Sequence, residues 1–223
     1  MNLYKGCSHG CIYCDSRSNC YHIDNFDKVR GKENALAILE HELARKKSGI
    51  IGIGAMSDTY NPFEIKYEQT RGALKLISKY NYGISIDTKS DLILRDLDLL
   101  KEINSKNNVI IKFTITTPND ALSKVIEPNV CPSSKRLKAI KELSANGIFT
   151  GIMLNPVLPF ITDKEEDIKL LVRLVYESGA KFIHTYLGMT LRENQRDYYY
   201  EKLDKYFPNL KEKYLKYYGE RYN

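Results

Sequence analysis

The sequence has 223 residues, of which 43% are hydrophobic and 28% are charged, and its formal net charge is +6. This composition is ordinary for a soluble globular protein with one sizeable domain, or two small ones at most. The sequence contains neither an apolar run of the roughly 18 residues that a membrane span needs nor a signal-peptide pattern, so we expect a cytoplasmic protein without membrane contact.

From residue 33 onward, helix and strand patterns alternate along the chain. Helices are predicted where apolar residues recur at helical spacing, and strands where short apolar or β-branched runs end at polar turns. Ser133 is the expected N-cap of one helix, and Gly147 follows the end of that helix. In chain order the expected elements are helix Glu33–Lys47, strand Ile50–Ala55, helix Glu64–Tyr80, strand Gly83–Thr88, helix Asp91–Ser105, strand Val109–Thr117, helix Ser133–Asn146, strand Gly151–Pro156, helix Lys164–Ser178 and strand Lys181–Leu187.

Strands that alternate with helices in this way form βαβ units with a parallel sheet. Five strands are clear, and Met1–Tyr4 is expected to supply the end of a sixth. The fold class is therefore α/β. We expect a six-stranded open barrel rather than a flat doubly wound sheet, although periodicity alone does not separate the two. The barrel is expected to occupy residues 1–189, with a helical extension over residues 190–223 packed on it.

The C-terminal segment Asn194–Gly219 is rich in Tyr and Lys, and Pro208 is expected to divide it into two helices. Tyrosines at helical spacing favour packing over a functional surface, although aromatic and basic residues together also suit nucleic acid. The 34 basic and 28 acidic residues are interspersed, which permits nucleic acid as a partner without requiring it. We expect the protein to be a monomer.

Three of the five cysteines fall within eight residues, in the segment GCSHGCIYC. Cys7, Cys11 and Cys14 have the spacing C-x3-C-x2-C, which does not resemble a disulfide framework because the count is odd and the context is not secretory. Three thiolates on one loop can bind three irons of a cubane cluster and leave the fourth iron open. Gly6 and Gly10 relieve the crowding of a loop wrapped round such a cluster.

The alternative for these cysteines is structural zinc, which takes four Cys or Cys/His ligands. Cys20 or His22 is then the candidate fourth ligand. Cys131 lies far from the other cysteines in the sequence, and a lone thiol of this kind is expected to be inert. A zinc ribbon does not account for the βα alternation that follows, so the cluster is favoured.

The cysteine spacing, with Tyr13 before the third cysteine, resembles that of the radical S-adenosylmethionine (SAM) superfamily. Further segments resemble the spore photoproduct lyase-like subfamily, whose members are also known as DNA repair photolyases. These segments are Asp15–Tyr21, Gly54–Pro62, Thr88–Ser90, Glu127–Pro128 and Arg136, and the resemblance covers roughly residues 1 to 190.

The resemblance implies a partial (β/α)6 barrel of the TIM type with a [4Fe–4S] cluster held by Cys7, Cys11 and Cys14. It implies that the open iron binds SAM, and that one electron cleaves SAM to a 5′-deoxyadenosyl radical. An electron donor such as flavodoxin or ferredoxin would supply that electron. In the family's pattern, Ser57 and Asp58 meet the SAM ammonium and Lys89 pairs with its carboxylate.

The residues themselves agree with this placement, because several polar side chains follow the ends of predicted strands. In β/α barrels, active sites are built at the carboxyl ends of the strands. The predicted cofactor contacts are Tyr13, Ser57, Asp58, Lys89, Thr114, Thr116 and Asn155.

One position departs from the subfamily. In spore photoproduct lyase itself a cysteine just before the Ser-Asp pair returns a hydrogen atom to the product radical, whereas Ala55 or Met56 stands there in this chain. Repair of spore photoproduct is therefore not expected, and the substrate stays open, with nucleic acid as one candidate. A second hypothesis from another class is a non-catalytic Fe–S or zinc module that binds nucleic acid.

Overall fold

The computed structural model describes residues 1–219 and contains five parallel strands in one sheet. The strands follow one another in sequence order, β3-β4-β5-β6-β7, and each is parallel to the next. A doubly wound sheet reverses its strand order at one point, and this sheet does not. Their bounds are Ile50–Ile53 (β3), Gly83–Thr88 (β4), Val109–Thr114 (β5), Phe149–Val157 (β6) and Ile183–Leu187 (β7).

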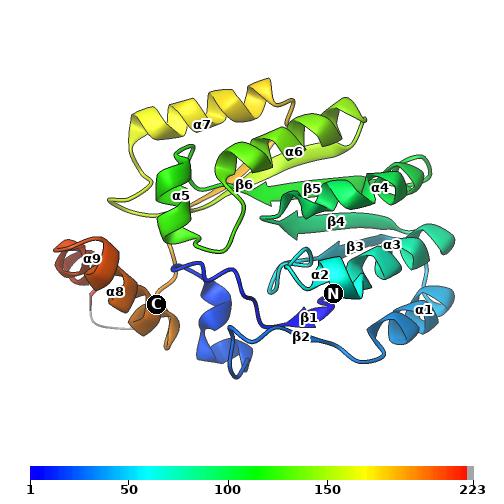
Figure 1. Cartoon of the computed structure of the whole chain (residues 1–223), viewed down its shortest axis with the longest axis horizontal. Coiled ribbons are helices and arrows are strands. Elements are labelled where there is room, and N and C mark those ends of the chain that lie inside the picture. The colour runs from blue at the N-terminus through cyan, green and yellow to red at the C-terminus, as the bar shows by residue number, and fades with distance from the viewer. Residues whose placement is uncertain (220–223) are drawn as a thin grey trace.

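The main helices that precede β3 or connect the five strands cover one face of the sheet (Figure 1). They are α1 (Ala35–Arg45), α3 (Gln69–Lys79), α4 (Leu97–Asn104), α6 (Ser133–Ala145) and α7 (Glu165–Glu177). A singly wound sheet with helices on one face is the architecture of a partial TIM-like barrel. The α/β class and the open barrel are therefore confirmed, and no closed barrel is present in residues 1–219.

The prediction of a sixth barrel strand from Met1–Tyr4 was wrong. Tyr4–Lys5 forms β1, which pairs antiparallel with β2 (Arg30–Gly31) in a separate two-stranded sheet. These short strands bracket the cysteine loop, so the chain must double back between them. The Met1 ammonium group donates a hydrogen bond to the Gly52 carbonyl (2.5 Å), which holds the start of the chain beside β3.

Several helix boundaries differ from expectation. The predicted helix Glu64–Tyr80 is two helices, α2 (Glu64–Tyr67) and α3, because Glu68 adopts left-handed backbone geometry with φ of 47°. The predicted helix over residues 91–105 begins as a 3₁₀ turn, Asp91–Asp96, before α4. A short helix, α5 (Asp120–Ile126), was missed; the Asn119 side chain accepts hydrogen bonds from two amides of its first turn.

The expected cap of α6 was also wrong. Pro132 occupies the N-cap position, and Ser133 is instead the first helical residue. At the other end Gly147 follows the helix with φ of 77°, as the sequence predicted. Glycine suits this position because the left-handed region carries no steric penalty without a Cβ.

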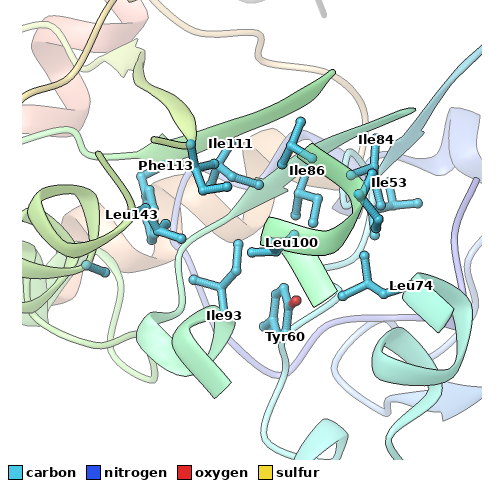
Figure 2. Close-up of a cluster of buried hydrophobic side chains, with 14 of the residues drawn as sticks. Ile53, Tyr60, Leu74, Ile84, Ile86, Ile93, Leu100, Ile111, Phe113 and Leu143 are labelled. Carbon is cyan, nitrogen blue, oxygen red and sulfur yellow. The ribbon is translucent and has the colours of Figure 1, made fainter. Parts of the chain in front are cut away.

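The main core lies between the sheet and these helices (Figure 2). Alternate residues of β4 and β5 point into it, and Ile84, Ile86, Ile111 and Phe113 have no exposed surface. Leu100 of α4 packs against them from the helical side and is equally buried. Burial of each such side chain contributes about 1.5–3 kcal/mol, so this layer fixes the strand ends that carry the polar residues described below.

Two further helices, α8 (Gln195–Tyr206) and α9 (Leu210–Tyr218), end the described chain, and Pro208 lies between them as predicted. They lie beside the N-terminal loop, drawn in blue, rather than on the main helical layer (Figure 1). Tyr199, Leu203 and Tyr214 are buried with Ile12 and Tyr13 in a second apolar cluster. These tyrosines pack as predicted; the domain boundary at residue 189 stays a prediction. No helix within residues 1–219 is both long and apolar enough to cross a bilayer.

Candidate active site

A cavity of about 490 Å³ lies at the carboxyl ends of the strands, between the sheet and the cysteine loop. Strand register brings the polar residues to this edge: Thr88 stands opposite Phe113, and Thr114 opposite Met153. The structure brings eight of the ten predicted site residues together in the cavity lining. They are Cys7, Cys11, Tyr13, Cys14, Asp58, Lys89, Thr114 and Asn155.

The other two predicted residues, Ser57 and Thr116, are buried but do not line the cavity. The Ser57 hydroxyl donates to the Gly6 carbonyl (2.5 Å), so it fastens the cysteine loop to the end of β3. Thr116 lies beyond the end of β5 and is not among the lining residues. Neither stands where it would touch a molecule in the cavity.

The cysteine loop is held by three backbone hydrogen bonds to two other segments of the chain. The Cys7 amide donates to the Phe26 carbonyl (2.8 Å), the Ile12 amide donates to Ile126 (2.9 Å), and the His9 carbonyl accepts from Asn129 (3.1 Å). At Gly6 the φ is +79°, and a Cβ would lie 2.6 Å from the carbonyl oxygens of Phe26 and Lys28. The loop therefore needs glycine there, in agreement with the sequence-based expectation.

All three thiols of the loop are free, and all three line the cavity. Burial raises the pKa of the Cys11 and Cys14 thiols. Burial acts in the same direction on Cys7, but the neighbouring His9 side chain outweighs it and lowers the pKa of that thiol. A thiol releases its proton when it binds iron, because the thiolate is the ligand. These buried cysteines therefore fit a metal cluster, in which the iron compensates the thiolate charge.

The remaining cysteines lie elsewhere. Cys20 and His22, the candidates for a fourth zinc ligand, are exposed, and the Cys20 sulfur contacts the Arg192 guanidinium (3.6 Å). Cys131 lines a neighbouring hollow and donates to the Lys89 carbonyl (3.2 Å), and burial raises its pKa to about 11. A zinc ion needs its ligands round one point, whereas a cubane takes each thiolate on a different iron. The positions of Cys20 and His22 favour the cluster.

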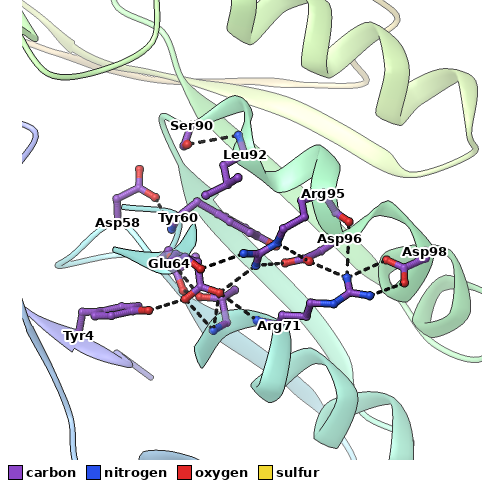
Figure 3. Close-up of polar contacts among 12 residues, drawn as sticks. Tyr4, Asp58, Tyr60, Glu64, Arg71, Ser90, Leu92, Arg95, Asp96 and Asp98 are labelled. Carbon is purple, nitrogen blue, oxygen red and sulfur yellow. Dashed lines mark hydrogen bonds and ion pairs between the residues drawn. The ribbon is translucent and has the colours of Figure 1, made fainter. Parts of the chain in front are cut away.

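Asp58 joins the end of β3 to the end of β4. Its carboxylate accepts hydrogen bonds from the amides of Tyr60 (2.9 Å) and Lys89 (2.7 Å) and from the Thr88 hydroxyl (2.8 Å). The His9 ring lies 3.6 Å away. Figure 3 shows the Asp58 carboxylate bonded to the Tyr60 amide, near a separate polar group in which Arg95 binds Glu64. These three donors from the protein use most of the lone pairs of the Asp58 carboxylate. Asp58 therefore fixes the ends of β3 and β4 relative to each other, whether or not it also contacts a ligand.

Lys89 presents a cation to the cavity. Its ammonium lies over the Tyr13 ring, 5.9 Å from the ring centre, and it forms no ion pair within the described part of the chain. Burial lowers the pKa of Lys89, but the nearby Cys11 and Glu127 groups outweigh burial and raise it. The side chain is therefore protonated and has hydrogen-bond capacity left for an anionic group of a bound molecule.

A buried ion pair supports this rim from behind. Glu127 and Arg136 are fully buried and 2.5 Å apart, and Glu127 also accepts from the Tyr13 hydroxyl. Arg136 donates to the carbonyls of Thr114 (2.6 Å) and Cys131 (3.0 Å). The pair thus ties the end of β5 to the loop after α5 and to the cysteine loop. Sequence reasoning noted both residues without assigning them this function.

Sequence reasoning missed the part of the lining that comes from β7 and the segment after it. A signal for these residues was available: side chains alternate between the two faces of a strand, and β7 reaches the same edge of the sheet. The missed residues include His184 and Tyr186 of β7, Met189 and Thr190 after it and, from other segments, His9 of the cysteine loop and Met153 of β6.

Comparison with known proteins agrees with this geometry. The sequence model of the radical SAM superfamily matches residues 1–172. An uncharacterized protein of Mycobacterium tuberculosis is 30% identical over 98% of this chain and 66% of its own length. An uncharacterized protein of Methanocaldococcus jannaschii is 36% identical over 74% of this chain and 62% of its own length.

Among solved structures, spore photoproduct lyase complexed with dinucleoside spore photoproduct is similar with a TM-score of 0.68 at 17% identity. The match covers 95% of this chain and 62% of the lyase. This chain thus spans about two thirds of the length of the relatives it matches. A family match over most of the chain, together with the fold and the three-cysteine cavity, leads to one conclusion: the chain belongs to the radical SAM superfamily.

Proposed function

We propose that Cys7, Cys11 and Cys14 hold a [4Fe–4S] cluster with an open iron at which SAM binds. The observation that carries the proposal is that three thiols and an unpaired lysine line one cavity at the carboxyl ends of the strands. When bound, such a cluster supplies the electron that cleaves SAM reductively to a 5′-deoxyadenosyl radical. A volume of about 490 Å³ is in the range of small-molecule sites.

The chain's own side chains have separate tasks in this proposal. Lys89 binds the SAM carboxylate, while Asp58 holds the β3 and β4 ends and presents its remaining lone pair to the ammonium. Thr114 and Asn155, on β5 and β6, face the part of the cavity farther along the sheet and would contact the adenosine. Tyr13, on the cysteine loop, presents its ring to the Lys89 ammonium.

Replacement of Lys89 by Ala should weaken SAM binding by roughly ten- to a hundredfold, because a charge-assisted hydrogen bond is commonly worth about 1.5–3 kcal/mol. The measurement is SAM affinity of the reconstituted protein by equilibrium dialysis. Lys138→Ala is the matched control, since that lysine is exposed on α6. Equal affinities of wild type and the Lys89 variant would contradict the assignment.

The substrate class that we favour is nucleic acid. Tyr186, on β7, lines the cavity and is 54% exposed, and Tyr217 of α9, which is not among the lining residues, is 70% exposed. The rings of Phe160 and Tyr217 meet edge to face, and the Lys213 ammonium lies 5.9 Å from the centre of Phe160. Exposed aromatic rings with adjacent cations suit stacked bases and phosphates.

Efficient repair of spore photoproduct is not expected. Ala55 and Met56 line the cavity where the lyase has its hydrogen-donating cysteine, and Cys131 lies outside the lining. Within the described residues, the cavity thus contains no thiol besides the three assigned to the cluster. Release of 5′-deoxyadenosine with dithionite and no DNA should still be measurable. Conversion of the lesion to two thymines would contradict this prediction.

The same assay separates the enzyme from the non-catalytic alternative. A binding module would retain metal and leave SAM intact, whereas an enzyme would release 5′-deoxyadenosine. The affinity for DNA at low and at moderate salt tests whether nucleic acid is the partner. Binding through phosphate contacts should weaken steeply as the salt concentration rises.

A further inference from the structure

We propose that Gln195 is a positioning residue for Cys14, the third cysteine of the cluster loop. Beside it, the contact between Thr190 and Asp15 closes the wall of the cavity on the side of β7. The proposal rests on the proposed function, since it concerns a cluster held by the cysteine loop. It goes further by assigning the segment between β7 and α8, far from the cysteines in sequence, to the stability and the reduction potential of that cluster.

The backbone of the third cysteine is held differently from that of the first. The Cys7 amide donates to the Phe26 carbonyl (2.8 Å), outside the loop. The Cys14 amide donates to the Cys11 carbonyl (3.3 Å), and the Cys14 carbonyl accepts from the Arg17 amide (3.2 Å), so both of these bonds are local. The position of the Cys14 thiol therefore depends on what holds the residues on either side of it.

The residues on either side of Cys14 are bonded to the segment that follows β7. The Gln195 side-chain amide donates to the Tyr13 carbonyl (3.1 Å). The Thr190 hydroxyl donates to the Asp15 carboxylate (2.5 Å). Tyr13 and Asp15 come immediately before and after Cys14 in the chain. The two bonds thus hold the third cysteine from both sides, as groups that orient a metal ligand commonly do.

Gln195 suits this task because its orientation is fixed. The residue is 1% exposed, and its side-chain oxygen accepts a hydrogen bond from the Arg192 amide (3.0 Å). A backbone amide can only donate and a carbonyl can only accept, so the Gln195 oxygen must face Arg192 and its nitrogen must face Tyr13. The Thr190 hydroxyl lies 3.2 Å from the same oxygen, which brings the two contacts together. Replacing Gln195 therefore leaves buried polar groups without partners.

The Thr190–Asp15 contact lies in the wall of the cavity, because both residues line it. β7 is the last strand of the sheet, so no further strand closes the barrel on this side within residues 1–219. The segment after β7 takes that place by crossing to the cysteine loop, where α8 begins (Figure 1). The Asn194 side chain fastens it there as well, through a hydrogen bond to the Arg17 carbonyl (2.8 Å).

The same contact includes a compensated charge. The Asp15 carboxylate also accepts from the Tyr21 hydroxyl (2.5 Å), and the Arg192 guanidinium lies 3.3 Å from it. An unpaired carboxylate beside Cys14 would add negative charge next to three thiolates. The reduction potential of an iron–sulfur cluster depends on net charge, hydrogen bonds and solvent exposure. These contacts should therefore influence the potential of the cluster as well as how firmly its iron is held.

The experiment measures anaerobic iron release from the reconstituted protein to a ferrous chelator, and the reduction potential of the cluster by redox titration. Gln195→Glu retains an acceptor for the Arg192 amide but removes the donor to Tyr13. Loss of a group that orients a metal ligand commonly changes metal affinity by about 10- to 100-fold, so this variant should release iron faster by a similar factor. Thr190→Val removes only the hydroxyl and should also shift the reduction potential, because it withdraws a hydrogen bond from Asp15 and opens the wall to solvent.

The matched control is Tyr199→Phe. It removes a buried hydrogen bond of the same helix, between the hydroxyls of Tyr199 and Tyr214 (2.8 Å), and leaves the bonds to the cysteine loop in place. Its iron release and reduction potential should equal those of wild type. Thermal melts of the iron-free variants, measured by circular dichroism, identify any variant that unfolds, and Thr190→Val tests the same contacts if Gln195→Glu does not fold.

The possible outcomes separate the two proposals. Wild-type iron release and potential in both Gln195→Glu and Thr190→Val would overturn the positioning assignment alone. An equal acceleration of iron release in Tyr199→Phe would also overturn it, because the effect would then come from the stability of α8. Failure of wild type to hold a four-iron cluster after reconstitution would instead overturn the proposed function.

Discussion

Replacing Cys7, Cys11 and Cys14 together by Ala should abolish iron binding and the release of 5′-deoxyadenosine. Each thiolate is assigned to a different iron of the cluster, and the described residues place no other cysteine in the cavity lining. Iron–sulfur clusters are held by Cys thiolates, and the triple variant removes every thiolate assigned to this cluster. The measurement is iron and sulfide content after anaerobic reconstitution, with the visible absorption of the cluster.

Cys20→Ala and Cys131→Ala are the matched controls, and both should keep the full iron content. Cys20 is exposed beside Arg192, and Cys131 faces the neighbouring hollow. Full iron retention in the triple variant would mean that the cluster site lies elsewhere. Loss of iron in Cys20→Ala alone would instead mean that Cys20 is a further ligand of the cluster.

Replacing Arg136 by Met should destabilise the protein by about 3–5 kcal/mol, because it leaves the buried Glu127 carboxylate without its ion-pair partner. Burial raises the pKa of Glu127, yet Arg136 outweighs burial and holds that pKa below its ordinary value. Without Arg136 the carboxyl must either stay charged in an apolar setting or take up a proton. The carbonyls of Thr114 and Cys131 also lose their donor.

The measurement is chemical denaturation, together with thermal melting, where such a loss corresponds to a fall of about 6–20 °C for a chain of this size. Adding Glu127→Gln to the Arg136 variant should recover part of the loss, since it removes the buried charge. The surface pair Lys169–Glu165 is the control, and Lys169→Met should cost at most about 0.5 kcal/mol. A loss below about 1 kcal/mol in Arg136→Met would contradict the structural assignment of the pair.

The sequence could predict the parts of the fold that depend on local patterns. Strand Gly83–Thr88 and helix Ser133–Ala145 follow from hydrophobic periodicity, and their observed bounds differ little from expectation. Elements whose limits depend on backbone geometry at one residue were misjudged. The break at Glu68 carries no sequence signal that periodicity detects, because Glu is ordinarily a helix-forming residue.

The candidate site divides in the same way. Sequence reasoning could identify the cluster ligands and the cationic residue of the site because each belongs to a short segment with a characteristic pattern. These residues are Cys7, Cys11, Cys14 and Lys89. Ser57 could not be separated from Asp58 by sequence, since both follow the same strand. In the structure the hydroxyl turns to the Gly6 carbonyl and the carboxylate turns toward the cavity.

By itself, the sequence determined the alternation of helices and strands, the α/β class and the three-cysteine loop. Those features depend on side-chain periodicity and on residues a few positions apart. Only the tertiary structure decided that β1 leaves the barrel to pair with β2, that Tyr186 reaches the cavity, and that Glu127 and Arg136 form a buried pair. These contacts join segments distant along the chain, and their geometry follows from how the packed layers meet rather than from any local pattern.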